Sequence, residues 1–342
     1  MRICILIQLF FIFSSFNLNL FSYATSKVTK IVAIHSYSKD FPWTHMILDS
    51  YKNELNSNKI NFEVINFYFD VKKVPFDITK VHPLMNEITK TLKQKKPDII
   101  FLTDDFAFHQ MSQLLIELKI PFVFAGINGE IPSTILQSNF KKYSGVFERY
   151  YVSDSVHLLE RLLNKNKLNL LVLLEKSETS DEVEKYIKNE FKKYPGLHYE
   201  ILKTSDFDIW KSSINNSKKK FDALYPLQPY ALKDSNGSYL KPAMVIEWIY
   251  NNSLIPTIYT AEWHIKCGGT LAIGLRPKAQ GQFGAKLTLD LLQNKITKPL
   301  IPPQGDIVIN YVTTEKLKIK IPFDILTTAK IVKSVSSPCN PD

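Results

Sequence analysis

Residues 97–128 constrain the fold more than any other part of the chain. Apolar runs at 98–102 and 120–124 have the length and composition of strands that are buried on both faces. Between them, apolar residues recur at spacings of three and four, which predicts a helix that ends near Leu118. A helix between two such strands makes them parallel neighbours, so the polar turns at 103–105 and 126–128 lie at one sheet edge. That edge is where open α/β folds bind ligands.

The same alternation fills the rest of the chain. The first half predicts strands at 30–35, 62–67 and 144–148 and helices at 44–55 and 83–94. The second half predicts strands at 169–174, 199–202, 221–225, 256–260, 270–273 and 307–311. It also predicts a helix that has Ser153 as its N-cap and ends at 163, and further helices at 180–194, 206–215, 240–251 and 280–293. We therefore predict an α/β protein of two doubly wound parallel-sheet lobes, which suits 342 residues. A single large sheet is the structural alternative.

The first residues read as an export signal rather than as part of the fold. Arg2 precedes an apolar run at 3–16 that is short for a bilayer span, and Ser22 and Ala24 stand at the positions of a cleavage site. We expect a signal peptide at 1–24, cut after Ala24; an uncleaved anchor is the alternative. No later apolar run approaches ~20 residues, so the mature protein is expected not to span a membrane and to lie in the periplasm or otherwise outside the cytoplasm.

Cysteine usage and charge restrict the other classes of function. Cys267 and Cys339 remain after cleavage and could pair, while Cys4 is removed, and no metal-ligand spacing is present. The net charge of +10 comes from lysines scattered over polar loops and helix ends. A solvated surface explains this pattern better than a nucleic-acid interface, although loose attraction to an anionic membrane stays open. No GxSxG, HExxH or Walker motif appears, so we expect neither an enzyme nor a bound cofactor.

Several motifs, taken in order, carry a family resemblance. They are HSYSKDFPWT after the first strand, then LTDD, FVFAGIN and SGVFE, and late in the chain GLRPKAQGQFGAKLTLDLLQNK and VINYVTTEKLKIKIPFDIL. The chain resembles the ABC-transporter substrate-binding proteins of type I periplasmic-binding-protein fold, including TrpX-like proteins and related sensor domains. The resemblance covers about 30–332; Trp43 and Phe147-Glu148 look more like the sensor-type branch.

The resemblance implies how the chain is divided. It implies two lobes with a ligand held between them and three crossings near Phe147, Leu275 and Pro303. The first lobe would comprise 25–147 and 276–302, the second 148–275 and 303–333, and 334–342 a tail. The helix from Gln280 would then return to the first lobe.

The strand-end turns supply the side chains that a solute site needs. Carboxylates accept hydrogen bonds from ammonium or hydroxyl groups, hydroxyl and amide groups adjust to a ligand, and aromatic rings cover its apolar faces. The first lobe offers Ser36, Tyr37, Trp43, Asp104, Asp105, Asn128 and Glu148, and the second offers Ser177, Gln228, Glu262 and Trp263. Alternatively, one of the adjacent aspartates only caps the following helix, and Trp43, Asn128, Glu262 and Trp263 serve packing, a turn or a surface loop. Tyr37 is the leading candidate.

These residues favour a small ligand that carries an amine or many hydroxyls and a flat apolar part, such as an aromatic amino acid. A solute receptor for an ABC permease is the first hypothesis. The alternative is a ligand-sensing input for a membrane-bound histidine kinase or cyclase, without transport. In both, a ligand that contacts the two lobes favours the closed arrangement.

Overall fold

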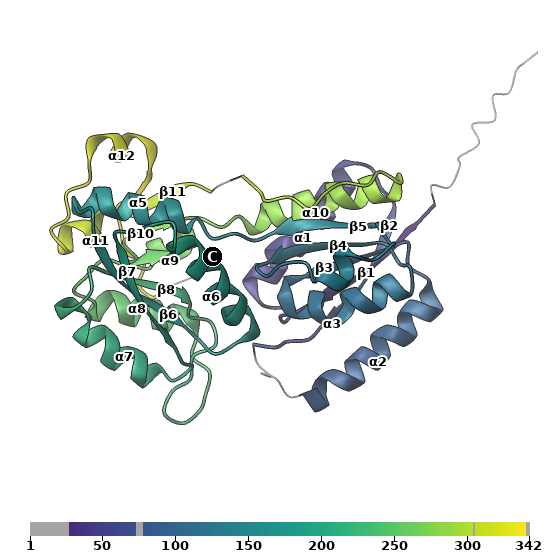
Figure 1. The fold of residues 1–342 in the computed structure, drawn as a ribbon, viewed down its shortest axis with the longest axis horizontal. Coiled ribbons are helices and arrows are strands. Elements are labelled where there is room, and N and C mark those ends of the chain that lie inside the picture. The colour runs from purple at the N-terminus through teal and green to yellow at the C-terminus, as the bar shows by residue number, and fades with distance from the viewer. Residues whose placement is uncertain (1–26, 73–77, 304, 340–342) are drawn as a thin grey trace, which may run out of the picture.

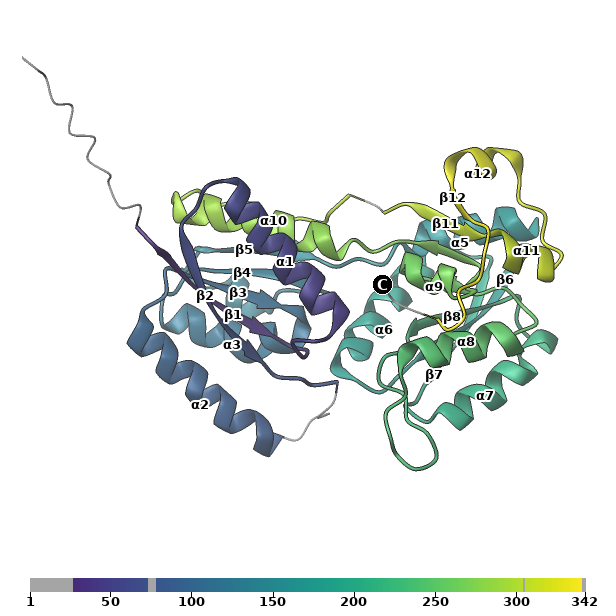
Figure 2. The ribbon, with the colours of Figure 1, turned by 180° about the vertical axis from the view of Figure 1, so that it is seen from behind.

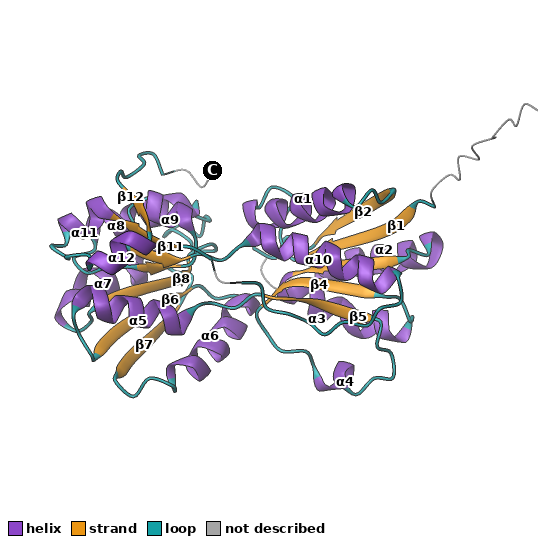
Figure 3. Ribbon diagram, turned by 90° about the horizontal axis from the view of Figure 1, so that it is seen from above, coloured by secondary structure: helices purple, strands orange, loops and turns teal. Residues whose placement is uncertain are grey.

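The computed structural model describes residues 27–72, 78–303 and 305–339, and these form two lobes that lie side by side (Figure 1). The expected signal peptide at 1–24 lies outside the described residues. Seen from above, narrow connecting segments join the lobes (Figure 3). Each lobe has its own sheets, so the alternative of one large sheet is wrong.

The first lobe is built on one parallel sheet with the strand order β2-β1-β3-β4-β5. Its strands are β1 (Thr29–His35), β2 (Phe62–Tyr68), β3 (Ile99–Thr103), β4 (Phe122–Ile127) and β5 (Tyr143–Phe147). Its helices from the same part of the chain are α1 (Pro42–Ser57), α2 (Ile78–Lys95), α3 (Asp104–Glu117) and α4 (Ser133–Leu136). Helix α10 (Pro277–Leu292) joins this lobe from much later in the chain.

Alternate residues of each central strand face opposite layers of helices. In β1 and β3, Ile31 and Ile99 pack in the cluster that contains α1 and α10 residues, whereas Val32 and Ile100 pack with α2 and α3 residues. Both faces of the sheet are therefore buried, which explains why its strands are continuous apolar runs. Viewed from behind, α1 and α10 lie together over one face of the sheet (Figure 2).

The second lobe contains two sheets with the strand orders β7-β6-β8 and β12-β11-β10-β9. The strands are β6 (Leu168–Leu174), β7 (Leu197–Lys203), β8 (Ala223–Gln228), β9 (Ile258–Tyr259), β10 (Leu271–Ile273), β11 (Ile307–Asn310) and β12 (Lys330–Val332). A parallel bridge from Leu224 to Thr257 links the two sheets. The pair β10–β11 is antiparallel, so this lobe departs from a purely parallel arrangement.

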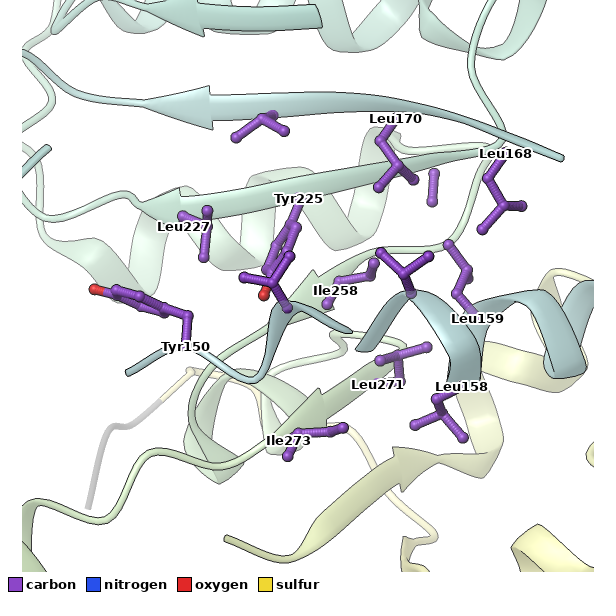
Figure 4. Packing of buried hydrophobic residues seen from close by; sticks show 14 of the residues in the cluster. Tyr150, Leu158, Leu159, Leu168, Leu170, Tyr225, Leu227, Ile258, Leu271 and Ile273 are labelled. Atoms are coloured by element: carbon purple, nitrogen blue, oxygen red, sulfur yellow. The ribbon is translucent and has the colours of Figure 1, made fainter. Parts of the chain in front are cut away.

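The helices of the second lobe cover both sides of these sheets. They are α5 (Val152–Leu163), α6 (Glu178–Phe191), α7 (Phe207–Asn216), a 3-10 turn (Ser217–Lys219), α8 (Pro242–Asn252), α9 (Glu262–Lys266), α11 (Tyr311–Lys316) and α12 (Phe323–Thr328). The larger core packs β6, β8 and β10 against α5 and α6. Figure 4 shows residues of this core from α5, β6, β8 and β10. In that view Tyr150 lies at the margin of the core with its hydroxyl directed away from it.

Three elements begin differently from what the sequence predicts. Helix α2 starts at Ile78, so Pro83 lies inside the helix instead of at its first position. The N-cap of α5 is Tyr151 rather than Ser153, whose hydroxyl instead donates to Glu190 Oε2 at 3.1 Å. The surface loop considered as an alternative for Glu262 and Trp263 is not formed, because α9 begins at Glu262.

Two further features concern the cysteines and the composition of the helices. Cys267 and Cys339 form a disulfide with their Cα atoms 5.1 Å apart, which resolves the open question of their pairing. Among the described helices, none has both the length and the apolar composition that a bilayer span requires.

Candidate functional site

The carboxyl ends of the first-lobe strands face the second lobe across a cavity of about 210 Å³. Six aromatic side chains from both lobes line it, and Asp104, Glu148 and Lys72 are among its other lining residues. The aromatic residues are Tyr37, Phe41, Trp43, Tyr150, Tyr230 and Trp263. Five predicted site residues therefore meet at one cavity: Tyr37, Trp43, Asp104, Glu148 and Trp263.

Tyr37 connects the two lobes. It follows β1, its side chain is buried, and its hydroxyl lies 2.7 Å from Thr179 Oγ1 in the first turn of α6. Its ring packs on Phe41, with the ring centroids 4.9 Å apart. Burial, with the nearby charge of Asp104, raises the pKa of the Tyr37 phenol well above its usual value, so the hydroxyl keeps its proton.

Asp104 presents one carboxylate oxygen without a partner. The indole Nε1 of Trp43 donates to Asp104 Oδ1 at 3.0 Å, whereas Asp104 Oδ2 is buried and has no hydrogen-bond partner. The backbone of Asp104 is left-handed, with φ +66°. This conformation is uncommon outside glycine, and such outliers gather at functional sites. Gly126 leaves room for the carboxylate, because a Cβ there would lie 2.9 Å from Asp104 Oδ1.

Glu148 follows β5 where the chain leaves the first lobe. Its side chain is buried at the cavity, and its backbone N–H donates to Ile127 O at 2.9 Å. Burial raises the pKa of the Glu148 carboxyl well above its usual value, and the charges of Asp104 and Asp105 raise it further. Burial and the charge of Asp105 raise the pKa of Asp104 in the same direction. These acids would gain most from a ligand that brings positive charge or several N–H donors.

Asp105 and Asn128 hold each other at the edge of the sheet and do not line the cavity. Asp105 Oδ1 accepts hydrogen bonds from the backbone N–H groups of Asn128 and Gly129 at 2.9 and 2.8 Å, and Oδ2 accepts from Asn128 Nδ2 at 3.1 Å. Asn128 Oδ1 is buried without a partner. Asp105 thus fixes the turn after β4.

Three other predicted residues make contacts within the fold instead of lining this cavity. Ser36 Oγ donates to Thr103 O and accepts from Ala107 N, which joins β3 to α3. Ser177 caps α6 by accepting from Ser180 N at 3.2 Å. Glu262 pairs with Lys330 at 2.7 Å and with Lys266 at 3.3 Å, away from the cavity. The side chain of Gln228 lies outside the described residues.

Lys72 is a cavity residue that the sequence analysis missed. It follows β2, is buried, and forms an ion pair with Glu175 at the end of β6, so the pair joins the lobes. Its Nζ lies 5.5 Å from the ring centroid of Tyr37 and 6.0 Å from that of Tyr230. Glu175 also accepts from the backbone N–H of Tyr230 at 2.8 Å. No sequence motif marks Lys72, because its role depends on a partner 103 residues away.

Tyr150, Thr179 and Tyr230 are also cavity residues outside the predicted set. Tyr230 follows β8, and its hydroxyl lies 3.2 Å from Nε2 of the buried His264. Its position directly after a strand was the signal that could have identified it. Within the described residues, no group of three or more His, Cys, Asp or Glu side chains could hold a metal ion.

Comparison with known proteins places this geometry in context. A sequence model of the family described as "ABC transporter substrate binding protein" matches residues 68–333. No curated protein gives a significant match.

Solved structures match over nearly the whole length. The ABC domain of Streptococcus pneumoniae in complex with L-Trp has a TM-score of 0.67 at 17% identity, covering 90% of this chain and 100% of that one. A ligand-free, open substrate binding protein with adhesive properties from Clostridium difficile has a TM-score of 0.62 at 16% identity, covering 90% and 100%.

A third structure widens the range of ligands on this fold. An ABC transporter solute binding protein from Bacillus halodurans C-125 with bound myo-inositol has a TM-score of 0.56 at 14% identity, covering 86% and 99%. These likenesses show that the fold is that of type I periplasmic binding proteins, as predicted. Because proteins of this fold bind ligands as different as L-Trp and myo-inositol, the side chains must decide the ligand.

Proposed function

The chain belongs to the ABC transporter substrate-binding protein family, and on that premise we propose that its cavity binds a small organic solute that carries an ammonium group and a flat apolar part. An aromatic amino acid is the favoured example. The family is one of binding proteins, so the chain is not an enzyme, in agreement with the sequence prediction. The observation that carries the ligand proposal is the buried pair Asp104 and Glu148 among aromatic rings from both lobes.

The free acceptor at Asp104 supports an ammonium group. A primary ammonium carries three N–H donors and no acceptor, so it suits a cavity lined by the carboxyl groups of Asp104 and Glu148. A sugar hydroxyl supplies one donor and brings no positive charge to these acids. The rings of Trp43, Tyr230 and Trp263 offer the apolar surface that a flat group would cover.

Closure of the lobes would couple binding to delivery. Ligand that touches both lobes stabilises the arrangement in which they are close, and a permease or another membrane protein can recognise that arrangement. We place the hinge near Phe147, Leu275 and Pro303, with lobes of 25–147 plus 276–302 and 148–275 plus 303–333.

We further propose that the protein works outside the cytoplasm after cleavage behind Ala24. The Cys267–Cys339 disulfide supports this location, because disulfides persist in oxidising compartments. N-terminal sequencing of the secreted protein tests it: a chain that begins at Thr25 is expected, and retention of Met1 would contradict cleavage.

Thermal-shift screening of the mature protein tests the ligand class. The panel contains aromatic amino acids, the corresponding arylalkylamines, aliphatic amino acids, purines and sugars. A ligand that binds only the folded state raises the melting temperature by mass action, and the aromatic compounds with an ammonium group are expected to give the largest shift. A shift with sugars alone would contradict the cation proposal, and no shift with any compound would contradict a solute site.

A signalling role is the second candidate. Its support is the likeness of Trp43 and Phe147-Glu148 to the sensor-type branch. Uptake of the identified ligand into vesicles that contain the protein and a permease encoded by a neighbouring gene would favour transport. Binding of the closed protein to the extracytoplasmic domain of a kinase encoded by a neighbouring gene, without uptake, would favour signalling.

A further inference from the structure

A histidine of the first lobe pairs with a glutamate of the second lobe beside the cavity. His109 lies on α3, and its Nδ1 is 2.6 Å from Oε1 of Glu178, the first residue of α6. Helices α3 and α6 contact each other across the two lobes. Neither residue lines the ligand cavity, and both side chains are about three-quarters buried, at 27% and 23% exposure.

The surroundings of His109 are acidic on both sides. Asp105 lies one turn earlier on α3, and Glu182 lies one turn after Glu178 on α6. The charges of all three carboxylates act on the imidazole of His109. Glu182 in turn pairs with Lys185 at 2.6 Å. The positive form of His109 is therefore stabilised chiefly by groups of the second lobe.

We propose that His109 and Glu178 form a proton-operated latch, which holds the lobes together while His109 is protonated and releases them when it loses its proton. The latch would regulate the site described under the proposed function, and it rests on that function only in assuming that lobe closure controls ligand access. His109 is a positioning residue in this proposal, since it does not touch the ligand.

The direction of the pH effect follows from the loss of Glu178 as a partner of His109 when the lobes open. The hydrogen bond and charge of Glu178 raise the pKa of His109 above its ordinary 6.5. When the lobes separate, Glu178 leaves with α6, and the pKa of His109 falls back towards the ordinary value. The closed arrangement therefore binds the proton more tightly and is favoured at low pH, and this advantage is lost as pH rises through the raised pKa.

Two other contacts between the lobes contain no histidine: the hydrogen bond between the Tyr37 and Thr179 hydroxyls, and the Lys72–Glu175 ion pair. The buried acids Asp104 and Glu148, whose pKa values are raised, line the cavity between the lobes, and the wild type and both variants of the test retain them. Histidine is the side chain whose ordinary pKa lies in the physiological range. Asp105 and Glu182 set the field at His109, so their replacement would shift the response without removing the pair.

The chain offers a matched control in His157. Its Nδ1 lies 3.0 Å from Glu160 Oε2 within α5, so the same kind of pair forms inside one lobe. His157→Gln removes a histidine–glutamate pair without touching the contact between lobes. His109→Gln removes the pair between lobes.

The test measures lobe separation in the ligand-free protein. Fluorophores on Gln94→Cys at the end of α2 and Ser212→Cys in α7, both exposed and in different lobes, report the distance by energy transfer. Between about pH 6 and about pH 8.5, the distance is expected to lengthen in the wild type and in His157→Gln, and to lengthen less in His109→Gln.

An unchanged pH response in His109→Gln, or a wild-type distance that does not move with pH, would overturn the latch. Circular dichroism checks that the variant folds. If it does not, Glu178→Gln decides, since loss of the carboxylate should reduce the response in the same way. No ligand is added, so failure here is separate from failure of the ligand screen.

Discussion

Trp43 Nε1 donates a hydrogen bond to Asp104 Oδ1 at 3.0 Å and leaves Asp104 Oδ2 buried and unpartnered. The two residues come from different strand-end turns, since Trp43 lies in the first turn of α1 and Asp104 begins α3. The indole N–H therefore orients the carboxylate of Asp104 without neutralising its negative charge. An oxygen that is desolvated and lacks a donor is costly, and a ligand that supplies an N–H group recovers that cost.

Asp104→Asn tests the role of this charge. The amide keeps the shape of the carboxylate but loses its negative charge, so affinity for a cationic ligand from the screen should fall roughly 10- to 100-fold, as for a hydrogen bond to a charged group. Isothermal titration measures the change. Glu262→Gln, which removes a carboxylate outside the cavity, serves as the control and should leave affinity unchanged. Equal affinity of wild type and Asp104→Asn would contradict the assignment.

Cation binding should depend on pH. Burial raises the pKa values of Asp104 and Glu148 above the ordinary 3.8 and 4.5, so part of the empty site retains a proton. A bound cation favours the ionised form, so binding releases protons and affinity rises as pH increases through the raised pKa values. Titrations in buffers of different ionisation enthalpy should show this release in the wild type and less of it in Asp104→Asn. In His109→Gln, which lacks the latch, an affinity that decreases as pH rises would contradict this prediction.

The stability of the ligand-free protein should change with pH in the opposite direction. The stabilising contribution of an acid whose folded pKa is raised is complete below its unfolded pKa and is lost as pH rises through the folded pKa. Chemical unfolding of wild type and Asp104→Asn at several pH values measures this. The wild type should lose more stability with rising pH than the variant, and parallel curves would argue against a buried, strained carboxylate.

Helix α10 should tolerate no side chain at position 281. A Cβ on Gly281 would lie 2.1 Å from the backbone oxygen of Ile47 and 2.1 Å from Ser50 Oγ, so Gly281→Ala must push α10 away from α1. We expect the free energy of unfolding to fall by about 1–3 kcal/mol, as for overpacking. Gly274→Ala is the control, because its Cβ would lie 3.8 Å from the nearest neighbour. Equal urea midpoints for the two variants would contradict the close packing.

The disulfide should stabilise the second lobe. It closes a loop across a sequence separation of 72, so Cys267→Ser with Cys339→Ser should lower the free energy of unfolding by about 2–5 kcal/mol. Calorimetry with and without reductant measures this. Reductant should lower the melting temperature of the wild type and leave that of the double variant unchanged. A wild type insensitive to reductant would indicate that the bridge contributes little.

The fold was predictable because its strands are buried on both faces. Largely apolar runs such as β3 and β6 must lie in the buried centre of a sheet. The helices between such strands make the strands parallel. Short late elements such as α11, α12 and β12 were not predicted, since their few residues carry no periodicity of their own. Helix α5 begins after Tyr151, whose side chain makes no capping hydrogen bond, so no capping residue marks its start in the sequence.

The cavity was only partly predictable for a different reason. Sequence places Asp104 and Asp105 in the same turn, but the left-handed backbone at Asp104 determines which carboxylate reaches the cavity and which holds Asn128. Lys72 and Glu175 acquire their role only through contact between the lobes. Such pairings depend on tertiary structure, and a single sequence contains no signal for them.

The late position of α10 in the chain has a consequence for biosynthesis. Its residues, Pro277–Leu292, cover one face of a sheet whose last strand ends at Phe147. A nascent chain that has left the ribosome only as far as β5 has α1 on this face but lacks α10, so the part of the apolar face that α10 covers stays exposed until α10 has been made. For the export proposed above, this delay would keep the first lobe from completing its fold before translocation.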